Sequence, residues 1–342
     1  MLALRKIMAG PGASLQNVDP PVLRASELRL AVEAVGICGT DLHIVDWHGG
    51  YEAMETVMPV TLGHEIAARV ISGEGLPHGQ RVVVRPSVTC EIACKTCGGN
   101  REDSCLKRTG IGIFRDGGFA QELLAPLRNC VPIPAGVPSE HAALTEPLTV
   151  SHEAARNAAI QPGDRVLVLG PGPIGLGAAL FAREFGAEVV VAGRQDRVRL
   201  EAARALGFEH ALDVGDGSLA DALERAGLVG SFQAIIEAVG APAVLRESMD
   251  LLAPHGRTVI AGIHPRPVEI DVTRLVRQHQ ALVGSYRAPF ATWRTVLDWI
   301  AVHPSHAKTM ISARLPLTRI EEGFRLMRDR AVVKVIIEPG EG

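Results

Sequence analysis

The sequence predicts an α/β protein of two domains: a β-rich domain, and a doubly wound domain built on a parallel sheet. Three observations support this fold class. The 342 residues exceed the roughly 250 at which single cores stop growing. Up to about residue 150 the chain shows short apolar runs punctuated by glycine and proline, which is typical of strands and turns. From about residue 161, apolar runs alternate with helical segments, the pattern of βαβ units.

The elements follow this pattern along the chain. Strands are expected at 28–36 and 80–86, and a helix at 40–47. In the second domain, strands are expected at 165–170, 187–193, 232–240, 257–262 and 281–286. The tail has helical patterns at 291–303 and 319–329 and a last strand at 332–339, and we expect it to rejoin the first domain. The predicted domains are therefore 1–150 with 287–342, and 151–286.

Composition excludes several classes of protein. Hydrophobic residues make up 47% and charged residues 21%, a globular composition, and 35 basic against 38 acidic side chains give a net charge of -3. Without a basic excess, neither a nucleic acid nor an anionic membrane is the expected partner, which leaves a small molecule. No run of about 18 apolar residues occurs, so we expect a cytoplasmic protein.

A glycine-rich loop directly follows the expected strand at 165–170. Gly170, Gly172 and Gly175 have G-x-G-x-x-G spacing, and with Pro173 and Ile174 they open a helix. This context predicts a dinucleotide site, since the glycines permit a tight turn and close approach of the pyrophosphate to the helix N-terminus.

The end of the next strand favours NADP over NAD. An acid that binds the adenosine ribose of NAD is expected about 20 residues on. Gly193 stands in that slot with Arg194 beside it, and the guanidinium could pair with a 2′-phosphate. Two alternatives stay open: Arg194 is a solvated loop residue, or Asp196 takes the acid's place.

Metal-ligand chemistry gathers in the first domain. Cys38, His64 and either Glu65 or Glu146 form a borderline-soft donor set that suits Zn²⁺ with an open coordination position. Taken singly, the cysteine and the histidine are more often ordinary buried residues.

Four motifs, "GICGTDLH", "GHE", "EPLTVSHEA" and "GPGPIG", occur in the order found in zinc-dependent medium-chain alcohol dehydrogenases. The chain resembles the sorbitol and threonine dehydrogenase branch over essentially its whole length. The resemblance implies a GroES-like catalytic domain and a Rossmann cofactor domain. It also implies that Cys38, His64 and Glu146 bind a catalytic zinc, with water or substrate in the fourth place and Glu65 close enough to exchange.

The resemblance assigns roles to residues near Cys38 as well. Asp41 is expected behind His64, Thr40 on the substrate hydroxyl, and His43 at the end of a proton relay. Thr40 and Asp41 have an alternative role as caps of the expected helix. Trp47, His48 and Tyr51 are expected to line the substrate pocket.

A cysteine cluster resembles the structural-zinc lobe of the same family. Its spacing is C-x3-C-x2-C-x7-C, one residue longer in the first gap than in the family, which a loop bulge can absorb. We expect four thiolates on one zinc, with a degenerate lobe of free thiols as the alternative. The four are Cys90, Cys94, Cys97 and Cys105.

The expected activity is hydride transfer between a secondary alcohol, a polyol or similar compound, and NAD(P), giving a ketone. Arg287 is expected near cofactor and substrate, or else in an interdomain salt bridge. The resemblance also implies a homo-oligomer, a tetramer or dimer. Two other functions stay open: a zinc-independent NADPH quinone or enoyl reductase on the same scaffold, and a non-catalytic zinc-ribbon protein that binds nucleotide.

Overall fold

The structure is a computed structural model that describes residues 1–90, 105 and 107–340. The chain divides into two compact units, and each is described by itself. Unit 1 comprises Met1–Glu146 and Trp293–Gly342, and unit 2 comprises Pro147–Thr292. Both boundaries fall inside helices, α3 (Thr145–Asn157) and α9 (Phe290–Val302), near the predicted boundaries at about residues 150 and 287.

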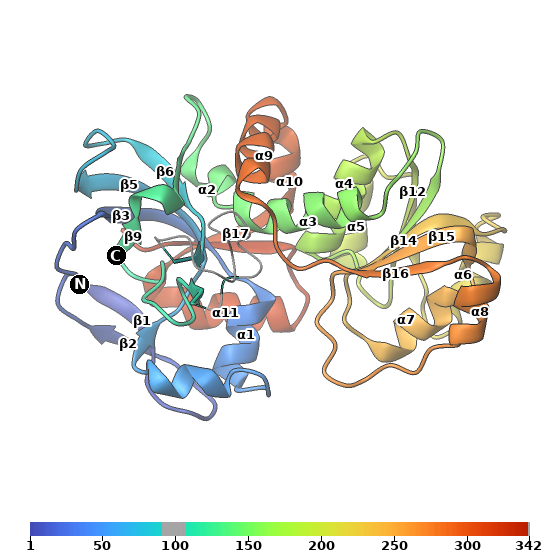
Figure 1. Ribbon diagram of the computed structural model, residues 1–342, viewed down its shortest axis with the longest axis horizontal. Helices are drawn as coiled ribbons and strands as arrows, with labels where there is room; N and C mark the ends of the chain where they lie inside the picture. Colours follow the sequence, from blue (N-terminus) through green and yellow to red (C-terminus); the bar gives the residue numbers. More distant parts are fainter. Residues whose placement is uncertain (91–104, 106, 341–342) are drawn as a thin grey trace. The chain divides into compact units, whose positions relative to one another are not determined.

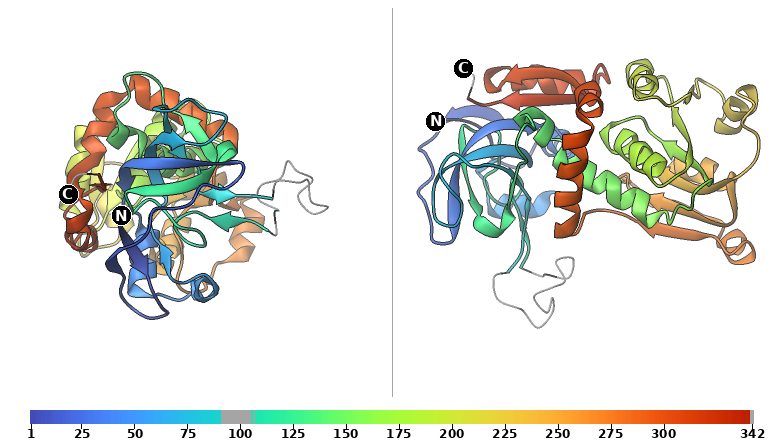
Figure 2. Two further views of the ribbon diagram at one scale, coloured as in Figure 1. Left: turned by 90° about the vertical axis from the view of Figure 1, so that its left-hand side faces the viewer. Right: turned by 90° about the horizontal axis from the view of Figure 1, so that it is seen from above.

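Unit 1 is rich in β-structure. The largest sheet among its described residues has the order β10-β6-β5-β3-β18-β17, with β9 also paired to β3. The last strand, β18, pairs with β3 through Ile336 and Gly36, so the tail of the chain completes the sheet that its first part begins (Figures 1 and 2). The strands are β1 (Leu2–Lys6), β2 (Ser14–Asn17), β3 (Glu27–Gly36), β4 (Val60–Thr61), β5 (Glu65–Ser72), β6 (Arg81–Val84), β7 (Ser87–Val88), β8 (Thr109–Gly110), β9 (Glu122–Pro126), β10 (Cys130–Pro132), β17 (Ile311–Pro316) and β18 (Lys334–Glu338).

Helices cover the core of unit 1. Phe324 of α11 packs edge-on against Phe119, with 6.3 Å between the ring centroids, and both rings are fully buried. Burial of this apolar face fixes α11 over β17 and β18. The helices are α1 (Gly39–Asp46), η1 (Glu52–Thr56), η3 (Leu127–Asn129), α2 (Ser139–Ala142), α10 (Pro304–Met310), η4 (Leu317–Arg319) and α11 (Ile320–Arg328), together with the parts of α3 and α9 that lie in this unit.

Unit 2 is a doubly wound parallel sheet of order β13-β12-β11-β14-β15-β16. The strand order reverses between β11 and β14, which creates a topological switch point at their carboxyl ends. The central strand β11 is apolar in every residue after Arg165, because helices cover both faces of the sheet. The strands are β11 (Arg165–Leu169), β12 (Glu188–Gly193), β13 (His210–Asp213), β14 (Phe232–Glu237), β15 (Leu252–Ile260) and β16 (Ala281–Gly284).

The helices of unit 2 lie in two layers. Figure 1 shows α4 and α5 over one face of the sheet and α6, α7 and α8 over the other. Their bounds are α4 (Pro173–Glu184), α5 (Arg197–Ala205), α6 (Leu219–Arg225), α7 (Pro242–Met249) and α8 (Val272–Arg277). In the described part of the chain, no helix combines the length and the apolar character needed to cross a bilayer.

Candidate metal and cofactor sites

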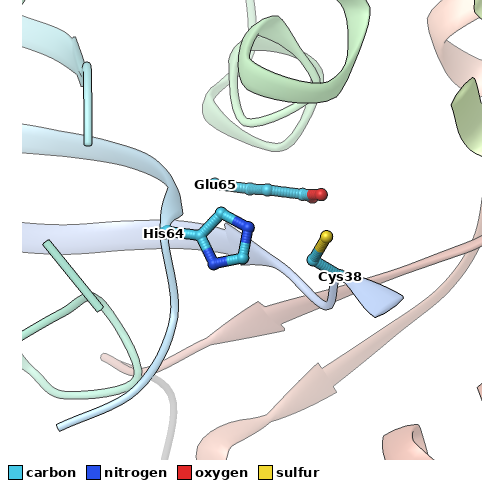
Figure 3. Close-up of side chains that lie close together, drawn as sticks. All are labelled: Cys38, His64 and Glu65. Atoms are coloured by element: carbon cyan, nitrogen blue, oxygen red, sulfur yellow. The ribbon is translucent and has the colours of Figure 1, made fainter. Parts of the chain in front are cut away.

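Cys38, His64 and Glu65 bring one sulfur, one imidazole and one carboxylate together. Their donor atoms all lie within 4.8 Å of one another, and Figure 3 shows the three side chains converging. Cys38 precedes α1, just after β3 ends, whereas His64 and Glu65 stand at the start of β5. Because β3 and β5 pair with Gly36 opposite Glu65, the register of these two strands assembles the cluster.

Gly36 gives the Glu65 side chain its space. A Cβ atom at this position would lie 1.9 Å from Oε2 of Glu65, far inside van der Waals contact. The carboxylate can occupy this position only because the opposite residue in the pairing has no side chain.

Asp41 contacts both the N-cap of α1 and His64. Its Oδ2 accepts a hydrogen bond of 2.9 Å from the backbone N–H of Cys38, the N-cap of α1, and its Oδ1 lies 3.5 Å from Nδ1 of His64. Thr40 is not the cap, since α1 begins at Gly39. Burial alone would lower the pKa of His64, but the charges of Asp41 and Cys38 outweigh it and raise the pKa well above its ordinary value. The site therefore favours positive charge at His64.

Lys334 is a residue of this site that the sequence analysis missed. Its ammonium donates to Oε1 and Oε2 of Glu65, at 2.7 and 2.8 Å, and to the carbonyl oxygen of Ile37 at 2.9 Å. Both Lys334 and Glu65 are only 1% exposed. The available signal was a single lysine inside the otherwise apolar strand "VVKVIIEP", since lysine is almost never fully buried unless it is paired.

Glu146 lies beside the cluster but is not one of its three donors among the described residues. It stands in the first turn of α3. Burial raises the pKa of Glu146 to about 7; His64 and Lys334 lower it, while Glu65 and Asp41 raise it. Glu65 is thus one of the three convergent donors, and the expected ligand role of Glu146 stays a prediction.

The cluster fits a divalent zinc ion. A thiolate, an imidazole and a carboxylate are ligands that zinc prefers. The charges of Glu65, Asp41 and Glu146 act on one another here, and Lys334 is a lysine that interacts with Glu65 and Glu146. Buried negative charge of this density is stabilised by a cation.

The cysteine lobe is described only at its two ends. The backbone N–H of Cys90 lies 3.4 Å from Sγ of Cys105, so the two ends of the expected four-thiolate set are adjacent. Cys94 and Cys97 lie outside the described residues.

The glycine-rich loop of unit 2 follows β11 and opens α4. Gly170 has φ of +93°, a conformation that glycine adopts without strain. A Cβ on Gly175 would lie 1.8 Å from the carbonyl oxygen of Gly170, so helix and strand can pack this closely only with glycine there. Gly172 is the N-cap of α4 and Pro173 begins the helix, while the carbonyl oxygen of Ile174 accepts a hydrogen bond from Ser151. The free N–H groups of this N-terminus favour a bound anion.

The end of β12 has no room for an acid at residue 193. A Cβ on Gly193 would lie 2.8 Å from Cγ of Pro171. Arg194 is exposed and its Nη1 donates to the carbonyl oxygens of Gly215 and Gly217 at 2.6 and 3.1 Å. Asp196, the alternative acid, is buried with its carboxylate 3.5 Å from Arg199.

Arg287 stacks on its neighbour. Its guanidinium carbon lies 4.5 Å from the ring centroid of Tyr286, and Nη2 lies 3.3 Å from the phenol oxygen. Nη1 is buried and has no hydrogen-bond partner among the described residues.

Comparisons with known proteins agree with both units. A family model described as "Alcohol dehydrogenase GroES-like domain" matches residues 24–135, and one described as "Zinc-binding dehydrogenase" matches 173–302. An L-threonine 3-dehydrogenase of Mesorhizobium japonicum is 33% identical over 99% of this chain and 98% of its own. A sorbitol dehydrogenase of Halalkalibacterium halodurans is 29% identical over 99% of both chains. A crystal structure of a zinc-binding dehydrogenase of Sinorhizobium meliloti bound to NADP has a TM-score of 0.86 and 29% identity, and the match covers 99% of both chains.

Proposed function

The chain belongs to the zinc-dependent medium-chain dehydrogenases, in their sorbitol and threonine dehydrogenase branch, and from this premise we propose that it oxidises a secondary alcohol to a ketone with NAD(P). The substrate class that the relatives' names support is a polyol or a hydroxy compound of similar polarity. The observation that carries the proposal is the convergence of Cys38, His64 and Glu65 within 4.8 Å.

The site residues of unit 1 described above have separate roles in this reaction. Zinc supplies a Lewis acid that lowers the pKa of the substrate hydroxyl, and the nicotinamide supplies the hydride acceptor. Cys38, His64 and Glu65 hold the metal, and Asp41 orients His64 from behind. Glu146, whose charge interacts with those of His64 and Glu65, would serve as a further carboxylate ligand or position a water molecule. Thr40 binds the hydroxyl and passes its proton towards His43.

The test is a panel of polyols, amino alcohols and simple secondary alcohols, followed by nicotinamide absorbance with NAD and NADP in parallel. The proposal expects turnover of at least one secondary alcohol and its loss when zinc is removed. Reduction of quinones or enones by metal-free protein, without any alcohol oxidation, would replace the proposal with the zinc-independent reductase.

We infer that NADP is preferred over NAD. The support is the crowding at Gly193, which excludes an acid from the ribose slot, together with the exposed Arg194 at the end of β12. Arg194→Ala should raise the dissociation constant of NADP by roughly tenfold or more and leave that of NAD within about twofold, because one charge-assisted pair to the 2′-phosphate is removed. Equal effects on both cofactors, measured by fluorescence titration, would contradict the preference.

The cysteine lobe is proposed to hold a second, structural zinc. Cys90 and Cys105 are adjacent, and four thiolates on one metal stabilise a lobe that is too polar to bury a core.

We also infer that the chain forms a homo-oligomer, either a dimer or a tetramer. Its support is that β16 is an edge strand and that α8 beside it has no buried residue and exposes Val272 and Val276. Light scattering gives the molar mass that tests this inference.

A further inference from the structure

Two histidines face each other at the end of α1. Nδ1 of His43 lies 2.9 Å from Nδ1 of His48, and the ring centroids are 5.2 Å apart at 55°. Both side chains are exposed. A hydrogen bond between two imidazole nitrogens needs one donor and one acceptor, so a single proton lies between the two rings.

The pair depends on an unusual turn. Residues five apart on a continuous α-helix differ by about 140° in direction, so their side chains would point away from each other. Trp47 ends α1 instead in the left-handed conformation, with φ of 57° and ψ of 48°, and the backbone N–H of His48 donates to the carbonyl oxygen of His43. The chain reverses there and brings His48 back to His43.

The surroundings hold this turn in place. The left-handed region is unfavourable for a residue other than glycine. Nζ of Lys6 lies 4.8 Å from the ring centroid of Trp47, and Asp46 pairs with Arg328 of α11 at 2.6 Å. Strained backbone that is stabilised from two sides is a frequent feature of functional sites.

We propose that His48 is the solvent-side member of the proton relay: it acts through His43 as a positioning residue and takes up the proton that His43 receives. This inference rests on the proposed alcohol dehydrogenase function. Thr40 and His43, three residues apart, share one face of α1, so the relay follows this face to the pair.

The proton balance of the step is simple. Before turnover His43 carries its proton on Nδ1 and donates it to Nδ1 of His48, which carries its own proton on Nε2. A proton arriving at Nε2 of His43 is matched by transfer of the Nδ1 proton to His48. His48 then releases its Nε2 proton to water, so one proton enters, one leaves, and both rings end neutral.

The charges around the pair suit this role. Burial and the neighbouring His48 lower the pKa of His43, and Asp46 raises it in part. The other charged groups near this turn are Lys6 of β1, whose pKa the charge of Asp46 raises in part, and Arg328 of α11, which pairs with Asp46. His43 therefore holds a proton less tightly than a free imidazole does, which favours passing the proton on to His48.

The test compares wild-type protein, His48→Ala and His48→Asn, all loaded with zinc. Asparagine keeps a hydrogen bond to His43 but cannot carry a proton. We expect kcat for alcohol oxidation at about pH 6–7 to fall by about tenfold in both variants, with KM little changed. This fall is smaller than the one expected when a general base that touches the substrate is removed. Added imidazole should restore the rate of His48→Ala. The matched control is His78→Asn, an exposed histidine between β5 and β6, which should retain the wild-type pH profile.

A second measurement does not depend on turnover. NMR titration of labelled histidines in the zinc-loaded protein should show a higher pKa of His43 in His48→Asn than in wild type, because a neighbouring imidazole that repels its proton is gone. A wild-type pH profile in His48→Asn would overturn the relay and leave a structural role. An unchanged titration of His43 would overturn the coupling between the rings. If wild-type protein oxidises no alcohol, the proposed function fails, and the titration still reports on the pair.

Discussion

At the scale of single residues, Glu65 has the environment that bears most on the metal site. Lys334 binds both carboxylate oxygens, and the missing side chain of Gly36 leaves space that the carboxylate occupies beside β3. The sequence supplied the donor types, because cysteine, histidine and glutamate at these positions are recognisable by their chemistry. It did not supply the partner of Glu65, since Lys334 lies 269 residues away in the chain.

Lys334→Met should destabilise the metal-free protein by about 3–5 kcal/mol, because it leaves the buried Glu65 carboxylate without its partner. Urea unfolding of metal-free protein measures this loss. The double variant Lys334→Met with Glu65→Gln should recover much of it, since no uncompensated charge is left. Lys308→Met, at an exposed lysine of α10, is the matched control. A loss below about 1 kcal/mol for Lys334→Met would contradict the account.

At the scale of elements, the sequence predicted the strand, loop and helix from β11 to α4. The apolar run, the spacing of the glycines and the start of the helix all indicate the same strand–loop–helix unit. It could not predict the left-handed cap at Trp47, where no glycine marks the end of α1. It also could not predict the pairing of β3 with β5, because register depends on contacts between distant segments. The pairing of His43 with His48 depends on the first of these features, and the position of Glu65 opposite Gly36 depends on the second.

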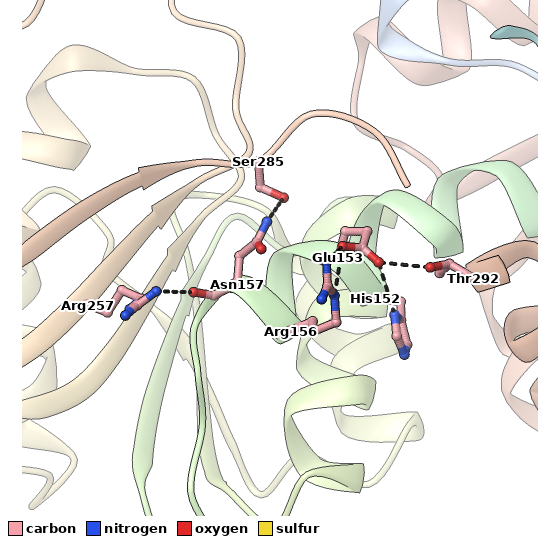
Figure 4. A network of polar contacts seen from close by, with 7 residues as sticks. All are labelled: His152, Glu153, Arg156, Asn157, Arg257, Ser285 and Thr292. Atoms are coloured by element: carbon pink, nitrogen blue, oxygen red, sulfur yellow. Dashed lines mark hydrogen bonds and ion pairs between the residues drawn. The ribbon is translucent and has the colours of Figure 1, made fainter. Parts of the chain in front are cut away.

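A polar network joins α3 to neighbouring segments of unit 2 (Figure 4). Glu153 accepts hydrogen bonds from Arg156 at 2.7 and 2.9 Å and from Thr292 at 2.8 Å. Asn157, one turn on, bonds Ser285 at 3.1 Å. Burial alone would raise the pKa of Glu153, but hydrogen bonds with His152, Arg156 and Thr292 outweigh it and lower the pKa to about 2.

A carboxyl group whose pKa is lower in the folded than in the unfolded chain stabilises the fold above its unfolded pKa, and this contribution is lost as the pH falls through the folded value. Glu153→Gln should therefore lower the free energy of unfolding near pH 7 by about 1–2 kcal/mol, a modest value because Arg156 is exposed to solvent. The difference from wild type should shrink between about pH 4 and pH 2.

Urea unfolding at several pH values measures this dependence. Glu209→Gln, at an exposed glutamate before β13, should match wild type throughout. A destabilisation of Glu153→Gln that stays constant down to about pH 2 would show that lost packing, not charge, is the cause.

We propose that the cysteine lobe between β7 and β8 depends on a bound metal for its stability. Cys105→Ser should lower the zinc content from about two ions per chain to about one and lower the melting temperature. Cys130→Ser is the control: burial raises the pKa of the Cys130 thiol to about 12, so it stays protonated and should not bind zinc. An unchanged zinc content in Cys105→Ser, measured by atomic emission, would mean that the lobe binds none.

At the scale of the whole molecule, the candidate metal site and the candidate cofactor site belong to different units, so the proposed function depends on both. The metal cluster combines the N-cap of α1 with residues at the start of β5 in unit 1, and Lys334 of β18 binds Glu65. The glycine-rich loop lies at the switch point of unit 2. The alternation of strands and helices predicted this division. The sequence did not show that its boundaries fall inside α3 and α9, because an uninterrupted helix gives no local signal of a domain boundary.

The most direct test of the central claim is a metal titration of the whole protein. Zinc is removed by a strong chelator, alcohol oxidation is measured with saturating NAD(P), and zinc is then returned in steps. The account predicts that activity disappears with the metal and returns as the site at Cys38, His64 and Glu65 fills, with no recovery in Cys38→Ser. Undiminished alcohol oxidation by protein shown to hold no metal would contradict it.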